Sequence, residues 1–341
     1  MFKRLRYLYV FLIGLLLAIS ITYIPLPYYI TKPGMADKLQ PYVQVENGYK
    51  EKGDFMLVTV SMSRANITNY VVAKFNKYHE IYKENDILQK GESDEDYQFR
   101  QMYLMQESQN AAIYNAYKQA QKPIQFENRG VLVVSIANNM PAAKELKLGD
   151  RLTVVDGKPL QTAQEFIDYM KTKQKDDKVT IEYLRGNEKK TSTFSLAPIP
   201  KEPNRFGIGI TIVTDQKMTV EPKVKIDSRQ IGGPSAGMMF TLEIYNQLTK
   251  EDITKGHEIA GTGTIDAEGN VGPIGGISQK IIAASDAGAE IFFAPNENGN
   301  KDSNYNEAVK TAKDIGTKMK IVPVDKWEDA LQYLEKLSQK K

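Results

Sequence analysis

Two residues, Ser235 and Lys280, have the types and surroundings that nucleophilic catalysis needs. Ser235 lies in the stretch GGPSAG, which leads directly into the apolar segment MMFTLEIYNQL. A serine at such a helix start is commonly an N-cap, part of a phosphate-binding loop, or a nucleophile. The phosphate loop is excluded, because the chain has no G-x-x-x-x-G-K-S/T motif and this stretch has no lysine. The N-cap and the nucleophile both remain open.

The segment around Lys280 supplies the base that a serine nucleophile needs. Ile277, Ala284 and Ala287 recur with helical spacing, and Lys280 falls on the same apolar stripe. Burial disfavours the charged form of a lysine and lowers its pKa, so a neutral Lys280 amine can accept the serine proton near pH 7. The alternative is a lysine at the edge of the stripe whose ammonium group reaches water.

The composition excludes several other classes of site. The chain has no cysteine, and its two histidines, His79 and His257, lie far apart and outside any H-E-x-x-H pattern. A net charge of only +3 gives no electrostatic footprint for nucleic acid. We therefore predict no metal, no other cofactor, and no nucleic-acid or nucleotide partner. His257 stays open as an alternative base for the serine.

A buried helix is predicted to hold the serine. Met238, Met239 and Leu242 follow Ser235 at i+3, i+4 and i+7, which is the spacing of one helix face. The strands that lead the chain to this helix are predicted at 205–215 and 220–227.

The first N–H groups of that helix are predicted to bind an oxyanion. They have no partner within the helix and lie at the positive end of its dipole. Such donors stabilise the charge that develops on a carbonyl oxygen during acyl transfer. The candidates for this oxyanion hole are Gly233, Ser235 and Ala236.

GGPSAG together with GTGTIDAEGNVGPIGGISQKIIAASDAGA resembles the proteolytic domain of Lon-type serine peptidases, and we assign residues 205–341 to this domain. The resemblance implies that Ser235 is the nucleophile, that Lys280 is the general base, and that Thr262 hydrogen-bonds the lysine. One departure is Gly232, where cytosolic Lon enzymes commonly carry an aspartate. A further difference is that the chain has no Walker motif and no ATPase domain.

The middle of the chain predicts a small β-rich domain. Strands are predicted at 131–136, 151–155, 179–184 and 191–196. They surround one amphipathic helix near residues 163–171, and the pattern over residues 127–199 resembles a PDZ domain of the kind attached to exported proteases. Such domains bind an extended peptide as an added strand at a sheet edge. The resemblance implies that the peptide-binding residues are Gly130, Val131, Leu132 and Val133.

The N-terminus carries a membrane signal. Residues 1–6 form a basic tail, and Tyr7–Ile24 has 18 residues without a charge, about 27 Å as a helix. We predict a transmembrane anchor at residues 7–30, with the N-terminus cytoplasmic and the remainder outside. Its outer aromatic belt would comprise Tyr23, Tyr28 and Tyr29. The alternative is a cleaved signal peptide, for which Ala18-Ile19-Ser20 is a passable cleavage site.

Residues 31–126 are predicted to form a linker followed by a strand and a helical segment that packs on the protease domain. The strand is predicted at 55–60 and is followed by two helical stretches. Ser93 is the predicted N-cap of the second helix. These charged and tyrosine-rich helices are interpreted as a solvated surface, and we assign them no chemistry.

The order of anchor, PDZ-like domain and Lon-type domain is similar to the membrane-bound PDZ–Lon peptidases of Gram-positive bacteria, the YlbL-like family. The resemblance implies an α+β chain that is a single-pass protein of the cell membrane with an extracellular catalytic domain. It also implies an ATP-independent serine endopeptidase that cleaves exported peptides or unfolded protein segments. The alternative is a membrane-tethered PDZ adaptor whose protease domain is inert. A homo-oligomer is a further expectation, because Lon-type domains often assemble in rings.

Overall fold

The computed structural model describes residues 6–7, 9, 11–15, 23–199, 202–228 and 231–340. The chain forms two compact units. The larger unit comprises Met1–Glu92, Leu104–Gln121 and Val224–Lys341, and the smaller unit comprises Ser93–Tyr103 and Lys122–Lys223. The smaller unit therefore consists of two segments, each of which interrupts the sequence of the larger one.

A six-stranded mixed sheet forms the centre of the larger unit, in the order β18-β17-β14-β3-β1-β4. Its strands are β18 (Lys320–Val324), β17 (Ile291–Pro295), β14 (Glu258–Gly261), β3 (Asp54–Asn66), β1 (Pro25–Lys38) and β4 (Glu80–Lys83). Strands β14, β17 and β18 run parallel to β3, whereas β1 is antiparallel to it. Two short pairs accompany the sheet: β2 (Val43–Val45) with β13 (Val224–Ile226), and β15 (Thr264–Ile265) with β16 (Val271–Gly272).

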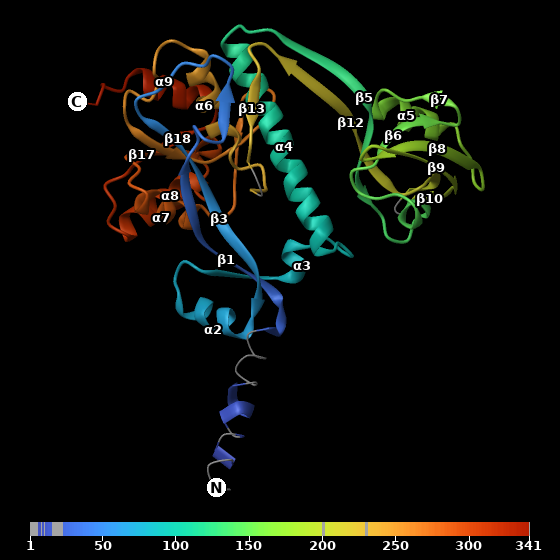
Figure 1. The fold of residues 1–341 in the computed structure, drawn as a ribbon, viewed down its shortest axis with the longest axis horizontal. Helices are drawn as coiled ribbons and strands as arrows, with labels where there is room; N and C mark the ends of the chain where they lie inside the picture. Colours follow the sequence, from blue (N-terminus) through green and yellow to red (C-terminus); the bar gives the residue numbers. More distant parts are fainter. Residues whose placement is uncertain are drawn as a thin grey trace. The chain divides into compact units, whose positions relative to one another are not determined.

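Helices cover both faces of this sheet (Figure 1). They are α6 (Gly237–Leu248), α7 (Ile277–Asp286), α8 (Asn304–Asp314) and α9 (Trp327–Glu335). Alternate residues of the strands, such as Met56 and Phe292, pack with α7 and α8 in one apolar cluster. The next residue of β17, Phe293, points to the other face and contacts Tyr333 of α9. The helix that follows Ser235, α6, and the helix that carries Lys280, α7, thus lie on opposite faces of the sheet.

The N-terminal segment enters this sheet earlier than we predicted. Residues 25–30 are strand rather than anchor, and residues 31–38 are strand rather than linker, because β1 pairs with β3 and, at Tyr28–Thr31, with β4. Tyr29 is only 5% exposed, so it belongs to the core and not to an aromatic belt. The predicted strand at 55–60 is confirmed as part of β3.

The predicted transmembrane helix lies partly outside the described residues, since residues 8, 10 and 16–22 are not among them. Within the described part of the chain, no helix combines the length and apolar character that a membrane crossing requires.

Three helices connect the strands of the N-terminal half: α2 (Ile67–Phe75), α3 (Glu84–Ile87) and α4 (Asp94–Gln119). Ser93 caps α4, as predicted, because its Oγ accepts a hydrogen bond from Asp96 N at 3.1 Å. The first residues of α4 group with the smaller unit and residues 104–119 with the larger one. Six of its residues are buried, so α4 has a packed face as well as a solvated one.

The smaller unit is a curled antiparallel sheet in the order β12-β5-β6-β8-β9, with β7 paired to β6. Its strands are β5 (Ile124–Ile136), β6 (Arg151–Val155), β7 (Lys158–Pro159), β8 (Lys178–Arg185), β9 (Glu188–Ser195) and β12 (Ile210–Val220), with a separate pair β10 (Ala197–Ile199) and β11 (Glu202–Gly207). Helix α5 (Ala163–Lys171) has the predicted bounds, and Thr162 caps it. All four strands predicted in residues 127–199 are present.

Strand β12 places the boundary between the units later than we predicted. We assigned residues from 205 onward to the second domain, yet β12 pairs with β5 from Ile210↔Ile136 to Val220↔Ile124. These pairings make residues up to Lys223 part of the smaller unit. The strand itself was predicted correctly. Its pairing with β5 was not predicted, because β5 lies far earlier in the sequence.

Candidate active site

Lys280, Ser235 and Thr262 meet in the larger unit. Lys280 Nζ lies 2.7 Å from Ser235 Oγ and 2.8 Å from Thr262 Oγ1. Thr262 Oγ1 in turn donates a hydrogen bond of 2.9 Å to the carbonyl oxygen of Ser235. Three segments far apart in the sequence therefore converge: the loop before α6, the residue after β14, and helix α7.

The loop that carries Ser235 is held by its backbone. Gly233 has φ +85°, a left-handed conformation that favours glycine. Gly263 N donates to the carbonyl oxygen of Ser235 at 2.8 Å, next to the bond from Thr262. The N-cap of α6 is Ala236, with no side-chain cap, so the N-cap interpretation of Ser235 is wrong. The helix begins two residues later than predicted and leaves the serine hydroxyl to face Lys280.

Lys280 is a lysine in the interior of the protein. Only 2% of it is exposed, and its hydrogen-bond partners are two hydroxyl groups and not carboxylates. Burial penalises the ammonium form and lowers the pKa of Lys280 from 10.5 to about 7. In a large fraction of the molecules, Lys280 is therefore a neutral amine near neutral pH, hydrogen-bonded to the hydroxyl group of Ser235.

The N–H groups around Ser235 divide into two sets. Gly237 N donates to Pro234 O at 3.4 Å, and Met238 N donates to Gly263 O at 3.2 Å. The predicted oxyanion donors, the N–H groups of Gly233, Ser235 and Ala236, have no acceptor in the described part of the chain. Two of them belong to Ser235 itself and to the residue that follows it.

Helix α4 contributes residues that sequence reasoning missed. Ser108, only 3% exposed, donates a hydrogen bond of 2.8 Å to the carbonyl oxygen of Pro234. Asn115 Nδ2 donates to the carbonyl oxygen of Asp266 at 2.8 Å. A Cβ at Gly237 would lie 2.5 Å from Ser108 Oγ, so this contact requires glycine at the helix start. The signal was available, because the small or apolar residues 105, 108, 112, 115 and 116 share one helical face.

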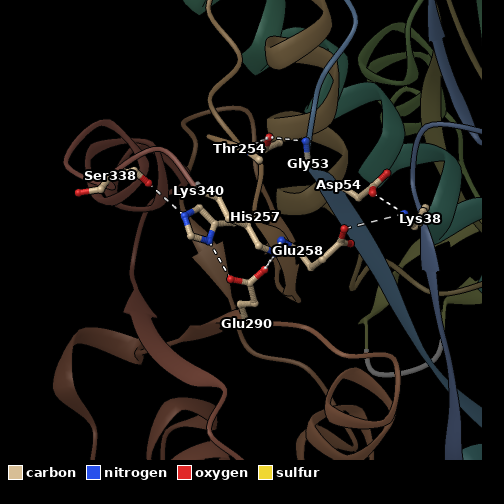
Figure 2. Close-up of polar contacts among 10 residues, drawn as sticks. Lys38, Gly53, Asp54, Thr254, His257, Glu258, Glu290, Ser338 and Lys340 are labelled. Carbon is tan, nitrogen blue, oxygen red and sulfur yellow. Dashed lines mark hydrogen bonds and ion pairs between the residues drawn. The ribbon is translucent and has the colours of Figure 1, made fainter.

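The alternative base, His257, is engaged elsewhere (Figure 2). Its Nδ1 lies 2.9 Å from Glu290 Oε2, and its Nε2 lies 3.0 Å from the carbonyl oxygen of Ser338. Burial acts to raise the pKa of Glu290, but hydrogen bonds from Lys340 and His257 lower it to about 2. Both ring nitrogens of His257 thus serve a polar cluster that ties down the C-terminal segment, and neither contacts Ser235.

The predicted peptide-binding edge is wrong. Val131 and Val133 of β5 are fully buried, and β5 has β12 on one side and β6 on the other. The terminal strand of the sheet is β12, whose outer side has no strand partner in the described part of the chain. Helix α5 lies beside it, with Ala163 N donating to Thr214 Oγ1 at 3.0 Å. A peptide added as a strand would pair with β12.

The described residues contain no group of three or more histidine, aspartate or glutamate side chains arranged to hold a metal ion.

Two protein families match this chain. The PDZ domain matches residues 106–196, and the Lon protease (S16) C-terminal proteolytic domain matches residues 189–336. The second match contains Ser235, Thr262 and Lys280, and it also extends over β12, which pairs within the smaller unit.

Similar proteins include two bacterial Lon proteases. The Lon protease of Metamycoplasma arthritidis is 33% identical over 151 residues, which cover 44% of this chain and 17% of the relative. That of Campylobacter jejuni is 29% identical over 176 residues, 46% of this chain and 21% of the relative. The chain thus spans about a fifth of the length of these relatives.

Among solved structures, the PDZ domain of the SdrC-like protein of Listeria monocytogenes is 40% identical in sequence, with a TM-score of 0.23. The match covers 25% of this chain and 87% of the Listeria chain. The chain combines a PDZ domain with a Lon-type C-terminal proteolytic domain, and together with its Lon protease relatives this supports a serine peptidase.

Proposed function

We propose that this protein is an ATP-independent serine endopeptidase in which Ser235 is the nucleophile and Lys280 the general base. The observation that carries the proposal is the 2.7 Å contact between Lys280 Nζ and Ser235 Oγ, made by a lysine that is 2% exposed. A buried amine whose pKa is near 7 has the basicity to accept a serine proton at neutral pH.

In the acylation step, the neutral Lys280 amine takes the proton of Ser235 Oγ while that oxygen attacks a peptide carbonyl. The tetrahedral intermediate collapses as the Lys280 ammonium gives the proton to the leaving amine. A water molecule then attacks the acyl-enzyme, with Lys280 again accepting a proton, and Ser235 is restored when the second product leaves. Thr262 orients both partners, because its hydroxyl contacts the lysine and the serine carbonyl.

The oxyanion of each tetrahedral intermediate is assigned to the N–H groups near Ser235. Ser235 N and Ala236 N lie directly before α6, where the helix dipole favours negative charge. Gly233 is the third candidate, and its left-handed backbone orients the loop. Removal of one such donor typically costs about 10²–10³ in kcat.

The PDZ domain is proposed to bind substrate peptides along the outer edge of β12. Support comes from the position of β12 as terminal strand and from α5 beside it, an arrangement that leaves main-chain groups for strand addition. The substrates that fit a protease without an ATP-driven unfolding motor are exported peptides or unfolded protein segments, because these are already extended.

The site of action is proposed to be the outer face of the cell membrane of a Gram-positive bacterium, as in the YlbL-like peptidases. Support comes from the basic residues before Tyr7 and the uncharged run from Tyr7 to Ile24. The proposal places the N-terminus in the cytoplasm and both folded units outside.

The first experiment incubates the full chain in detergent with a pool of unstructured peptides and follows cleavage by mass spectrometry. Ser235→Ala and Lys280→Ala should lose cleavage while keeping the circular dichroism spectrum and cooperative melting of the parent. His257→Ala is the matched control and should retain activity, since its partners are Glu290 and Ser338. Cleavage retained in both dyad variants would overturn the assignment. A parent chain that cleaves nothing but binds peptides would favour the inert PDZ adaptor.

A further inference from the structure

Helix α2 turns an apolar stripe toward the outside of the larger unit. Val71 is 50% exposed, Val72 is 52% exposed and Phe75 is 89% exposed. With the exposed Thr68 they stand at i, i+3, i+4 and i+7, the spacing of a single helix face. Soluble surfaces normally place polar residues on such a face. This stripe is therefore the reverse of the usual pattern.

The opposite face of α2 fixes this orientation. Ala73 is buried and packs with Ile30 of β1 and Ala65 of β3, and Tyr70 and Ile81 border the same cluster. Asn66 caps the helix, accepting from Asn69 N at 2.8 Å while Asn69 Oδ1 accepts from Asn66 N at 2.7 Å. The inner face is thus anchored through Ala73 and the helix start is capped; at the other end, directly after Phe75, Asn76 N donates to the carbonyl oxygen of Ala73 at 3.2 Å.

The stripe begins where the apolar N-terminal segment meets the fold. Pro25, the first residue of β1, pairs with Asn66, the N-cap of α2. The two residues before it, Tyr23 and Ile24, are 80% and 49% exposed. Figure 1 shows α2 at this end of the β1–β3 pair. Ile24, the last residue of the uncharged run, therefore directly precedes the strand residue that pairs with the N-cap of α2.

The charges of α2 fit a lipid surface. The helix contains no acidic residue, and its one charged side chain is Lys74, which lies 5.4 Å from the ring of Tyr70. Helix α8 of the same unit shows the usual alternative, with Glu307, Lys310 and Lys313 on its exposed side. A short helix with apolar residues on one side and lysine at its border is the pattern of an interfacial helix.

We propose that α2 lies in the membrane interface, with Val71, Val72 and Phe75 entering the boundary between headgroups and acyl chains. The proposal depends on one part of the proposed function, namely that residues 7–24 anchor the chain in the membrane. Two attachments, one spanning and one interfacial, hold the larger unit in a defined orientation. A protease held in this way acts on substrates close to the bilayer surface.

The absence of cysteine allows a direct test with the full chain. Single variants Val72→Cys and Phe75→Cys are labelled with an environment-sensitive fluorophore and reconstituted at high lipid-to-protein ratio into vesicles that contain nitroxide-labelled lipids. The matched control is Lys250→Cys, an exposed position in the loop that contacts the opposite end of β3 through Asp252 and Lys52. A circular dichroism spectrum and a cooperative melting transition like those of the parent show that each labelled variant is folded.

The expected result is quenching and a blue-shifted emission at positions 72 and 75, with neither change at 250. Equal, unquenched emission at all three positions in a chain that resists carbonate extraction would overturn the proposal and leave the anchor intact. A chain that carbonate extracts from the vesicles would overturn the anchor and the interfacial helix together. Disulfide formation between two copies of the unlabelled Val72→Cys variant, without lipid quenching of the labelled one, would identify the stripe as an interface between copies and also overturn the proposal.

Discussion

Ser108 Oγ donates a 2.8 Å hydrogen bond to the carbonyl oxygen of Pro234, the residue directly before Ser235. A helix that precedes the PDZ strands in sequence thus holds the loop of Ser235 from outside the Lon-type segment. Both partners belong to the larger unit, so the contact is part of one compact structure. Ser108 is a positioning residue, because it acts on Ser235 through the backbone.

Ser108→Ala should lower kcat with little change in KM. The variant removes the shorter of the two hydrogen bonds to the Pro234 carbonyl and leaves the 3.4 Å bond from Gly237 N, a loss of about 1 kcal/mol, and a displaced serine reduces the rate roughly tenfold or more. Steady-state kinetics on a peptide substrate provide the measurement, and Gln106→Ala, an exposed position on the same helix, is the control. An equal effect of both variants, or a change in KM alone, would argue against positioning. The pH midpoint of the rate should stay unchanged, since Lys280 is untouched.

The cleavage rate should depend on pH through Lys280. Only the neutral amine can accept the serine proton, and burial lowers the pKa of Lys280 to about 7. The value of kcat/KM should therefore rise with pH, roughly tenfold per unit below about pH 7, and level off above it. The measurement is kcat/KM between pH 5 and 9. A midpoint near the ordinary lysine value of 10.5 would contradict a buried neutral base.

The same lysine should make stability depend on pH in the alkaline range. The pKa of Lys280 is about 7 in the folded chain and has its ordinary value of 10.5 in the unfolded chain, so between these values the unfolded chain binds one more proton than the folded chain. Stability must then rise with pH across this window and lose that contribution again as pH falls toward 7. Lys280→Met should flatten this slope in thermal unfolding measured at pH 7 and pH 9.5. An unchanged slope would show that the lysine is not desolvated.

A buried pair of carboxyl groups beside the nucleophile helix predicts a slope of opposite sign. Glu243 of α6 accepts from Gln247 Nε2 at 2.5 Å, and Glu51 accepts from Asn246 Nδ2 at 2.5 Å. The other oxygen of each carboxyl has no partner among the described residues. Burial raises the pKa of Glu243 well above its usual range and that of Glu51 to about 7, and the charge of Glu51 raises the pKa of Glu243 further. One proton held between the two carboxyls accounts for these observations.

Glu243→Gln should therefore stabilise the protein at pH 8 and have little effect at pH 5. In the parent, the folded pair keeps a proton that the unfolded chain releases above about pH 4.5, so stability falls as pH rises from there through about 7. The amide removes this loss while keeping the shape of the side chain. Thermal unfolding at both pH values is the measurement, with the exposed Glu268→Gln as control. Destabilisation at pH 8 would exclude a shared proton.

Peptide binding to the PDZ domain should be visible at β12 and not at β5. Amide hydrogen exchange of residues 210–220 should slow when a peptide is added, because an added strand provides new acceptors for the outer N–H groups. The amides of Val131 and Val133 should not change, since β5 already has a partner on each side. Slower exchange at β5 alone would restore the original prediction of the binding edge.

Local sequence patterns were sufficient for much of the fold. Helix α5 was predicted near 163–171 from its amphipathic pattern, and the capping box of Thr162 and Glu165 explains why the helix starts there. The four strands of residues 127–199 were also predicted from alternation and turn residues. These signals act over a few residues and need no knowledge of the partner.

Predictions failed where a partner distant in sequence decided the outcome. The segment after Ile24 was interpreted as a continuation of the membrane span because it stays apolar, yet Pro25 and Tyr29 pair with β3 residues 41 and 35 positions later. Strand β12 was assigned to the wrong domain because its partner, β5, lies more than 70 residues earlier. Ser108 was overlooked because its acceptor, Pro234, is 126 residues away.

The sequence by itself determined which groups are present for catalysis: a serine at a glycine-rich helix start, a lysine on an apolar stripe, a threonine between them, and no cysteine or suitably spaced histidines as rivals. The tertiary structure decided what those groups can do. Side-chain type and periodicity are local, whereas the pKa of Lys280 near 7, its 2.7 Å contact with Ser235 and the engagement of His257 elsewhere depend on burial and neighbours. Burial and neighbours are set by the packing of α4, α6, α7 and β14, which no short stretch of sequence contains.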